Sequence, residues 1–388
     1  MKRILKRIYD GLNPWVRTIL ERLINIFRVF PFARNRAKYS YYNDRAAKSF
    51  FRRYLEILST VWKEGFEVRG RTPEHYYSFG LDCVGTKLSD YVFPGEFRNA
   101  EKCINDLKNP FYFTFTDKRI TSIVLHFFGL PQKKPFGVLD VDSEWQLQVS
   151  LLEGGTISWN EFLAKNAGID LFCKSLTGFG GEGAFRITQE DIREILAMND
   201  VVVKRIHDLF ILPAILQEVI ENHPLIAEVN PDTLNTIRIN TVIKDSTPHI
   251  LGAKFRMGTG SCQVDNYSMG GVIVPVDMTT GKLTKTGQRK PPYGFLHTEH
   301  PDTHIVFEGR EIPFWGEICS LVVKGHSLLR EPHTIGWDIA VTPSGPLIVE
   351  VNQYPDMDGE ASWRGVFDEF YIAEIEKLKK LKKSTQMP

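Results

Sequence analysis

The segment GWDIAVTPSGPLIVEVNQYPD, residues 336–356, places two carboxylates and an amide where they could form a metal site. Asp338 lies on one predicted strand, and a Pro-Ser-Gly-Pro turn leads to a second strand that carries Glu350 and Asn352. Because side chains alternate along a strand, these two share one face, with Val349 and Val351 on the other. A hairpin would bring Asp338 opposite them, and such hard oxygen ligands suit Mg²⁺ with phosphates completing its shell. The alternative is an acidic strand edge that faces solvent.

A lysine followed by glycines gives a second signal, in the segment CKSLTGFGGEGAF at residues 173–185. Lys174 ends a predicted strand, and Gly178, Gly180, Gly181 and Gly183 follow it. Glycines allow backbone N–H groups to approach phosphate oxygens closely, and the lysine supplies a positive charge. The order matches neither the Rossmann pattern nor the Walker pattern. A glycine-rich hairpin tip is the alternative.

A third segment, LPAILQEVIENHP at residues 212–224, is an apolar strand that runs into acidic residues. The backbone of such a strand could bind an adenine edge, and a following carboxylate could bind ribose hydroxyls. The candidate nucleotide-binding residues here are Gln217, Glu218, Ile220 and Glu221. The same pattern also describes an ordinary strand exit.

The elements around these segments indicate the fold class. Helical stretches are expected at 189–197, 316–330 and 364–381. Because strands and helices do not alternate regularly, the sequence predicts an α+β fold and not a doubly wound sheet. Short apolar runs between Gly and Pro predict strands at 137–142, 170–176, 236–243, 249–257, 270–277 and 345–352.

Composition excludes several classes of protein. The 388 residues are 43% hydrophobic and 24% charged, which excludes a mainly disordered chain and a polytopic membrane protein. The formal net charge of +1 suggests no nucleic-acid partner. The five cysteines contain no C-x-x-C pair, so a cytoplasmic location is expected.

The near-neutral charge hides a basic N-terminus. Residues 1–53 contain 14 Lys and Arg against 3 Asp and Glu. Residues 1–38 are expected to form a basic amphipathic helix, interrupted at Asn13-Pro14 and ending near Pro31. This helix could lie on an anionic membrane surface, or it could pack on its own domain or a partner. A second helical stretch, 44–67, carries apolar residues expected in the core: Phe50, Phe51, Tyr54, Leu55, Leu58, Val61 and Trp62.

The order of these signals resembles the ATP-grasp superfamily: lysine and glycine loop, strand with acidic exit, then D…E-x-N. Asp338 and Glu350 are 12 positions apart and Asn352 follows 2 later, as in that superfamily's metal-binding hairpin. The segment FTDKRITSIVLHFFGLPQKKP, residues 115–135, is similar to its opening segment. In D-alanine–D-alanine ligases a lysine at the position of Lys118 contacts the nucleotide phosphates.

The resemblance spans about residues 111–360 and implies two α+β subdomains that grip ATP. We expect a helical region at 1–67, a pre-ATP-grasp region at 68–150, a small subdomain at 151–225 and a large subdomain at 226–388. ATP would bind to Lys118, Lys174 and the glycines, and Mg²⁺ to Asp338, Glu350 and Asn352. No residue aligns clearly with the carboxylate that binds the ribose in that superfamily, so Glu221 is taken as the best available candidate.

Narrower matches indicate which enzymes of the superfamily are most similar. The segment DNYSMGG at 265–271 resembles the ribosomal-protein glutamate ligases, which implies active-site roles for Arg238 and Arg256. The segments PDTLNTIRINT and HPDTHIVFEGREIPFW look still more like sugar-transfer-associated ATP-grasp proteins. The resemblance implies an ADP-forming ligase that joins a carboxylate to an amine or hydroxyl, with a bacterial capsule or exopolysaccharide precursor as substrate. A peptide or protein amino-acid ligase and a non-catalytic ATP-binding scaffold are the alternatives.

Three histidines could suggest a different metal. His297, His300 and His304 have a spacing that resembles zinc ligands, but Pro301 would break a helix that placed them on one face. A loop over the substrate pocket and a plain surface loop are the other interpretations. Arg289 could bind an anionic substrate, or could be a solvated surface residue, and the same applies to Arg310.

Overall fold

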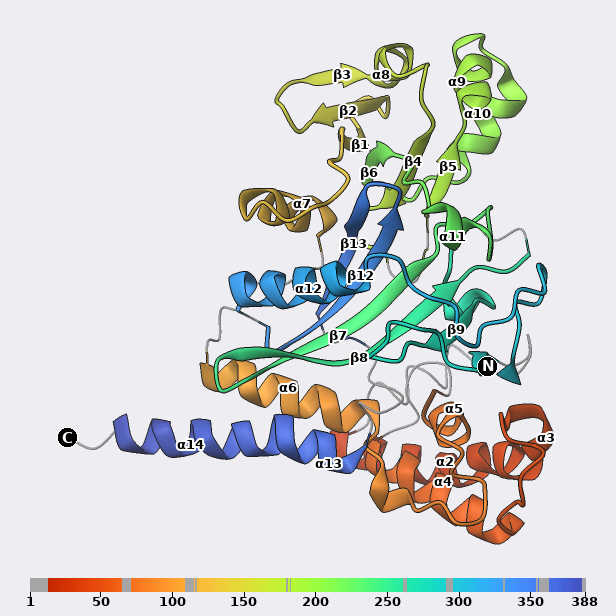
Figure 1. Ribbon diagram of the computed structural model, residues 1–388, viewed down its shortest axis with the longest axis vertical. Helices are drawn as coiled ribbons and strands as arrows, with labels where there is room; N and C mark the ends of the chain where they lie inside the picture. The colour runs from red at the N-terminus through yellow and green to blue at the C-terminus, as the bar shows by residue number, and fades with distance from the viewer. Residues whose placement is uncertain are drawn as a thin grey trace. The chain divides into compact units, whose positions relative to one another are not determined.

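The computed structural model describes residues 13–64, 71–108, 115, 117–178, 181, 183–260, 264–290, 296–330, 332–353, 355 and 363–385 (Figure 1). Contacts divide the chain into two compact units. The first comprises Met1–Ala100 and Met357–Ile372, and the second Glu101–Asp356 and Ala373–Pro388. The four-part division expected from the sequence stays a prediction.

Helices build the first unit around one apolar core. The longest, α2 (Pro14–Arg34), packs against α4 (Phe50–Glu64), and Val29 and Ala33 are fully buried there. Helix α6 (Pro94–Lys108) begins in this unit and ends in the second. The other helical elements among the described residues of this unit are α3 (Arg36–Tyr39), α5 (Arg71–Ser78), the 3₁₀ turn Leu88–Asp90, α13 (Arg364–Phe367) and the π-helical turn Asp368–Ile372.

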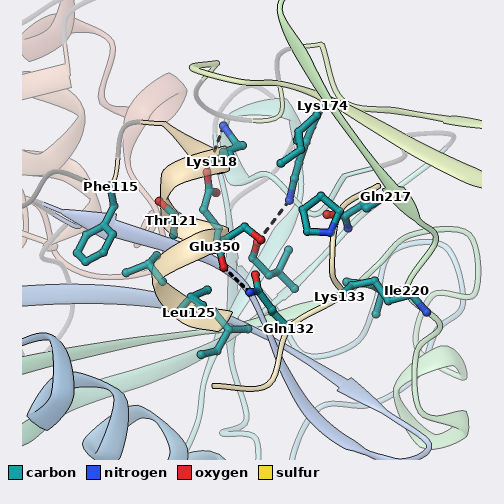
Figure 2. A pocket seen from close by; sticks show the side chains of 16 residues that line it. Phe115, Lys118, Thr121, Leu125, Gln132, Lys133, Lys174, Gln217, Ile220 and Glu350 are labelled. Carbon is teal, nitrogen blue, oxygen red and sulfur yellow. Dashed lines mark hydrogen bonds and ion pairs between the residues drawn. The ribbon is translucent and has the colours of Figure 1, made fainter. Parts of the chain in front are cut away.

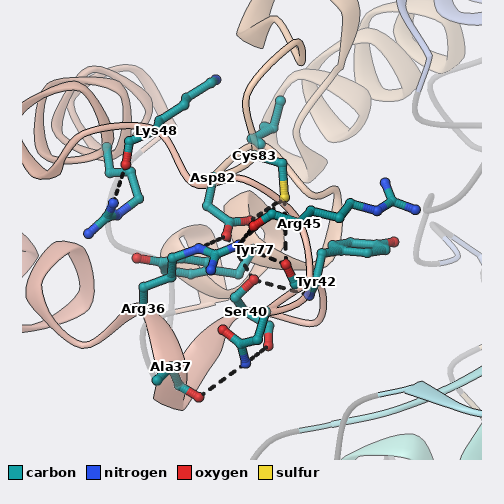
Figure 3. Close-up of polar contacts among 12 residues, drawn as sticks. Arg36, Ala37, Ser40, Tyr42, Arg45, Lys48, Tyr77, Asp82 and Cys83 are labelled. Atoms are coloured by element: carbon teal, nitrogen blue, oxygen red, sulfur yellow. Dashed lines mark hydrogen bonds and ion pairs between the residues drawn. The ribbon is translucent and has the colours of Figure 1, made fainter.

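A buried carboxylate holds the loop between α3 and α4 in place (Figure 3). Asp82 is fully buried and accepts hydrogen bonds from Arg36 Nε at 2.6 Å and Ser40 Oγ at 2.7 Å. The guanidinium of Arg36 also donates to the carbonyl of Tyr42 at 2.7 Å. Because a buried charge is costly unless it is paired, these contacts hold α3 and the loop after it against Asp82.

Two expectations about this region are wrong. Helix α2 does not end near Pro31 but continues to Arg34, since the carbonyl of Pro31 still accepts the N–H of Asn35 at 3.0 Å. Not all apolar residues of α4 lie in the core: Phe51 is 73% exposed, Leu55 60% and Trp62 47%. Residues 1–12 of the expected basic helix lie outside the described residues.

The second unit contains two sheets whose strands all pair in antiparallel fashion within the described residues, which confirms the α+β class. The six-stranded sheet has the order β3-β2-β1-β6-β4-β5 and carries helices on an apolar core. Its elements are β1 (Gly137–Val141), β2 (Leu147–Leu151), β3 (Thr156–Ser158), α8 (Trp159–Lys165), β4 (Leu171–Ser175), β5 (Phe185–Ile187), α9 (Gln189–Leu196), α10 (Asp200–His207) and β6 (Ala214–Glu218).

The seven-stranded sheet has the order β11-β10-β9-β8-β7-β12-β13 in the described part of the chain. Helix α12 (Trp315–Leu329) packs across β7, β8 and β12 (Figure 1). Trp337 of the sheet is fully buried and lies against Gly325 of this helix. The other elements are β7 (Thr236–Lys244), β8 (Thr247–Met257), β9 (Val272–Pro275), β10 (Gly287–Arg289), β11 (Leu296–His297), β12 (Thr334–Thr342), β13 (Gly345–Gln353), α7 (Lys118–Phe127), α11 (Pro224–Ala227), the 3₁₀ turn Tyr267–Met269 and α14 (Ala373–Thr385).

The strands expected from the sequence are all present with shifted ends, as are the helices near 189–197 and 316–330. The helix expected at 364–381 is divided into α13, a π-helical turn and α14. The segment at residues 115–135 contains α7, and Asp117 caps this helix by accepting the N–H of Arg119 at 2.9 Å and that of Ile120 at 3.3 Å.

Candidate functional site

One face of the seven-stranded sheet carries a row of charged residues from four neighbouring strands. Lys254 on β8 lies opposite Arg238 on β7, which lies opposite Asp338 on β12, which lies opposite Glu350 on β13. Residues directly opposite one another in antiparallel strands place their side chains on the same face. The hairpin expected from the sequence therefore brings Asp338 and Glu350 together, and Lys254 is a member of the row that sequence reasoning missed.

A β-bulge sets the register of this hairpin. Asp338 pairs with Glu350, but the next residue, Ile339, pairs with Ile348, so Val349 is an extra residue on β13. The core residues of β13, Ile348 and Val351, are consequently three positions apart instead of two. The expectation that Val349 lies on the same face as Val351, opposite Glu350 and Asn352, is wrong for this reason.

Two arginines hold Asp338, whose side chain is nearly fully buried. Arg238 binds it through Nε and Nη2, the latter at 3.1 Å from Oδ2, and Arg256 Nη2 lies 3.1 Å from the same oxygen. Burial alone would raise the pKa of Asp338, but the two guanidinium groups hold it below its usual value. Asn352 also donates from Nδ2 to Asp338 at 3.4 Å. The structure thus brings the predicted arginines to the predicted metal ligands.

Arg256 has a second carboxylate partner that sequence reasoning did not single out. Asp265 is buried and lies 3.2 Å from Arg256 Nη2. It also accepts the N–H of Thr236 at 2.9 Å and the hydroxyl of the same residue. Burial raises the pKa of Asp265, with Arg256 opposing that shift. The signal was available in the sequence, because Asp265 opens the segment DNYSMGG.

Two lysines from different elements lie near Glu350 of β13 (Figure 2). Lys118, the first residue of α7, lies with Nζ 3.5 Å from Glu350 Oε1 and donates to the carbonyl of Gly178 at 2.7 Å. Lys174, on β4, donates to the carbonyl of the bulged residue Val349 at 3.4 Å. Burial lowers the pKa of Lys174 to about 8, and Lys118 adds to that shift while Glu350 opposes it. Both predicted phosphate-binding lysines therefore lie beside a predicted metal ligand.

These lysines line an open-sided pocket with about 450 Å³ of empty space, counting its solvent-filled mouth. Gln217 and Ile220 of the third sequence segment line it too. Glu218 instead forms an ion pair with Lys133, 2.6 Å between Oε2 and Nζ, and Glu221 is exposed and does not line the pocket. Lys133 and Gln132 line the pocket as well, although sequence reasoning did not select them.

The glycine segment is described only in part. Gly178 contacts Lys118 as above, while Gly180 lies outside the described residues. Gly181 has φ +82°, and a Cβ atom there would lie 2.9 Å from Cγ2 of Val264. Gly183 has φ +67°. A side chain at Gly181 or Gly183 would be strained, which explains the glycines without assigning them a ligand.

The donor set at Asp338, Glu350 and Asn352 fits Mg²⁺. It supplies two carboxylates and one amide, all hard oxygen ligands, in register on adjacent strands. Because two arginines already hold Asp338, the metal would share that carboxylate with them. The negatively charged phosphates of a bound nucleotide would offset the positive charge of Lys118 and Lys174 nearby.

The three histidines do not form a metal site in the described part of the chain. No group of three or more His, Cys, Asp and Glu residues there is arranged to hold an ion. His300 is buried and hydrogen-bonds the carbonyl of Gly258 at 2.8 Å, and His304 pairs with Glu299 at 2.9 Å. Arg289 and Arg310 likewise make structural contacts: the first donates to the carbonyl of Gly270 at 2.6 Å, the second to that of Leu225 at 3.1 Å.

We predict that nucleotide binding takes up a proton at alkaline pH. Above pH 8 the Lys174 amine of the free protein is mostly neutral, because burial lowers its pKa to about 8. The phosphates of ATP favour the charged form, so binding should raise this pKa and draw a proton from solution. Calorimetry at pH 9 in two buffers of different ionisation enthalpy measures the uptake. The arginine of the Lys174→Arg variant stays charged, so this variant should bind ATP without taking up a proton. Equal proton uptake by both proteins would show that Lys174 is not the group that takes up the proton.

The sequence matches a known protein family. The sequence model of the sugar-transfer-associated ATP-grasp family matches residues 101–369. The sequence matches no curated protein significantly.

Solved structures of similar fold include D-alanyl-alanine synthetase A from Vibrio cholerae, at 10% identity and a TM-score of 0.41, with 69% of this chain and 65% of that chain covered. A D-alanine–D-alanine ligase from Bacillus anthracis complexed with ATP is 12% identical, with a TM-score of 0.37 and coverages of 69% and 68%. A RimK domain ATP-grasp protein from Sphaerobacter thermophilus is 16% identical, with a TM-score of 0.35 and 67% of each chain covered. This chain thus spans slightly less than two thirds of the V. cholerae synthetase. The match over residues 101–369 shows that the chain belongs to the sugar-transfer-associated ATP-grasp family.

Proposed function

We propose that the protein is an ATP- and Mg²⁺-dependent ligase that activates a carboxylate as an acyl phosphate. One observation carries this proposal: Lys118 and Lys174 meet at the part of the pocket wall that contains Val349 and Glu350. Glu350 lies opposite Asp338, which two arginines hold. Cations for phosphates, oxygen ligands for a metal and guanidinium groups for a transferring phosphoryl group are the parts such a reaction needs.

The proposed chemistry has two steps. A carboxylate oxygen of the substrate attacks the γ-phosphorus of ATP, and ADP leaves. An amine or hydroxyl then attacks the acyl carbon, loses its proton, and releases phosphate. ATP-grasp proteins use this strategy as ATP-dependent ligases, and the protein's part is mainly positioning and charge neutralisation.

The residues that line the pocket and those on the neighbouring strands would divide this work. Lys118 and Lys174 would neutralise phosphate oxygens, and Gln217 with Ile220 would contact the nucleotide base. Asp338, Glu350 and Asn352 would hold Mg²⁺, which neutralises β- and γ-phosphate charge when bound. Arg256, oriented by Asp265 and Asp338, would stabilise the transferring phosphoryl group, and Arg238 would do the same or bind the substrate carboxylate. Among the nucleotide-binding candidates, Glu218 and Glu221 are the weakest, since neither lines the pocket.

The family description supports a substrate linked to sugar transfer. We propose a bacterial capsule or exopolysaccharide precursor as the acceptor or donor, modified at the cytoplasmic face of a membrane. Peptide or protein amino-acid ligation is the second candidate, supported by the DNYSMGG segment that contains Asp265. A scaffold without turnover is disfavoured, because Lys174, Asp338, Glu350 and Asn352 are all retained.

Product analysis tests the reaction class. The protein is incubated with ATP, Mg²⁺, pooled amino acids and cell-envelope precursors, and ADP, AMP and phosphate are measured. ADP with phosphate is expected, and hydroxylamine should trap the acyl phosphate as a hydroxamate. AMP with pyrophosphate would refute the acyl-phosphate route, and tight ATP binding without turnover would favour a scaffold.

A further inference from the structure

Helix α2 exposes an apolar face on the side away from its own core. Asn25, Val29 and Ala33 are buried against the helical unit. On the other side Phe27 is 80% exposed and Leu23 49%, with Leu20 and Ile24 beside them on the helix. Hydrogen bonds fix this orientation, since Tyr54 donates to the carbonyl of Ile26 at 3.0 Å and Tyr77 to that of Phe32 at 2.6 Å.

Helix α4 extends the same surface. Phe51 and Leu55 are one turn apart and are 73% and 60% exposed. Phe50 joins the two helices, because its ring lies 5.5 Å from that of Phe30 on α2 and 5.6 Å from that of Phe51. At the other end, the guanidinium of Arg22 lies 4.8 Å from the ring centre of Trp62. We call the surface formed by Leu20, Leu23, Ile24, Phe27, Phe51 and Leu55 the α2–α4 apolar face.

The segment that carries this face has an excess of positive charge. Residues 13–64 contain 11 Lys and Arg against 4 Asp and Glu, and Arg22, Arg28 and Arg34 on α2 are all exposed. The segment 1–12 adds four more Lys and Arg against one Asp in the sequence. Exposed aromatic and aliphatic side chains combined with cations are typical of helices that lie in a membrane interface.

The charge distribution favours a membrane over other occupants. A second copy seated on the face would bring two positively charged surfaces together, whereas an anionic leaflet would neutralise them. A nucleic acid would satisfy the arginines but would leave Leu20, Leu23 and Leu55 without an apolar partner. In the described part of the chain, no helix is long and apolar enough to cross a membrane.

We propose that the α2–α4 apolar face inserts into the interface of an anionic lipid membrane, with Arg22, Arg28 and Arg34 at the headgroups. The inference deepens the membrane placement in the proposed function and does not depend on the ligase chemistry. The proposed membrane-binding surface differs from that of a single amphipathic helix because Phe51 and Leu55 of α4 are part of it.

Co-sedimentation of the full chain with vesicles tests the proposal. Vesicles of phosphatidylcholine with phosphatidylglycerol should bind the protein at least about tenfold more tightly than phosphatidylcholine alone, and high salt should weaken binding. The double variant Phe27→Ser/Leu55→Ser should lose at least about tenfold in affinity. Phe127→Ser, a matched change at an 80% exposed phenylalanine on α7, should bind like the wild type.

Several outcomes would overturn the proposal. Unchanged binding by the Phe27→Ser/Leu55→Ser variant would do so, as would equal binding to both vesicle types. A wild-type dimer in light scattering that the same variant converts to monomer would assign the face to a second copy. Loss of binding on deletion of residues 1–12 alone, with the double variant unaffected, would place the contact in that segment. Glu350→Gln should leave vesicle binding unchanged, so failure of the ligase proposal and failure of this one are distinguishable.

Discussion

The Glu350→Gln variant is expected to lose ATP turnover while it keeps its fold. Glutamine matches the shape of the carboxylate but removes the charge that would bind Mg²⁺ opposite Asp338. Metal stabilisation of phosphoryl-transfer charge is worth several kcal/mol, so a loss of about 4 kcal/mol, or about a thousandfold in rate, is expected. ADP release at saturating ATP and Mg²⁺ measures it.

The stability of this variant provides the control. The ion pair of Glu350 with Lys118 is partly exposed at 3.5 Å, so its loss should cost less than about 1 kcal/mol. Glu153→Gln, at an exposed carboxylate paired with Lys134, should leave both turnover and melting unchanged. Wild-type turnover by Glu350→Gln with a normal melting curve would remove Glu350 from the metal site.

The Asp338→Asn variant is expected to lose stability as well as turnover. Asp338 supplies the negative charge that lies between the guanidinium groups of Arg238 and Arg256. Breaking a buried charge pair by removing one partner costs about 3–5 kcal/mol, and the partial exposure of both arginines favours the lower end. Urea unfolding measures the change in free energy, and ADP release measures the activity.

A second substitution separates the two effects. Adding Arg238→Gln to Asp338→Asn removes one of the excess positive charges, so part of the lost stability should return while turnover stays low. Asp245→Asn, at an exposed carboxylate paired with Lys377, should unfold like the wild type. If Asp338→Asn unfolds at the wild-type urea concentration, the carboxylate does not hold the arginines in solution.

Much of the candidate site could be predicted because its residues follow strand periodicity and occur along the chain in the order that resembles ATP-grasp proteins. Asp338, Glu350 and Asn352 were placed on a hairpin by alternation and by the turn between them, and the register of β12 with β13 confirms the hairpin. The α+β class followed from the lack of regular alternation between strands and helices, and the antiparallel sheets confirm it. Roles for these residues stay predictions that the variants above test.

The parts that could not be predicted depend on contacts between distant segments. The segment DNYSMGG marks Asp265, but its contacts with Arg256 and Thr236 exist only because β8, β7 and the loop after β8 converge. Apolar spacing on α4 could not show that Phe51 and Leu55 face outward, since a helix with two apolar sides gives no sign of which is packed. The bulge at Val349 adds one residue without any Gly or Pro to mark it.

Because of that bulge, the number of residues between Asp338 and Glu350 does not by itself determine whether the two residues lie opposite each other. A relative without the extra residue would need one position fewer to place the same carboxylates opposite each other, and a longer turn would need more. Insertions and deletions are therefore tolerable at the turn and at the bulge, but not between Glu350 and Asn352. A search for distant relatives should accordingly allow a variable gap before the E-x-N triplet and a fixed one within it.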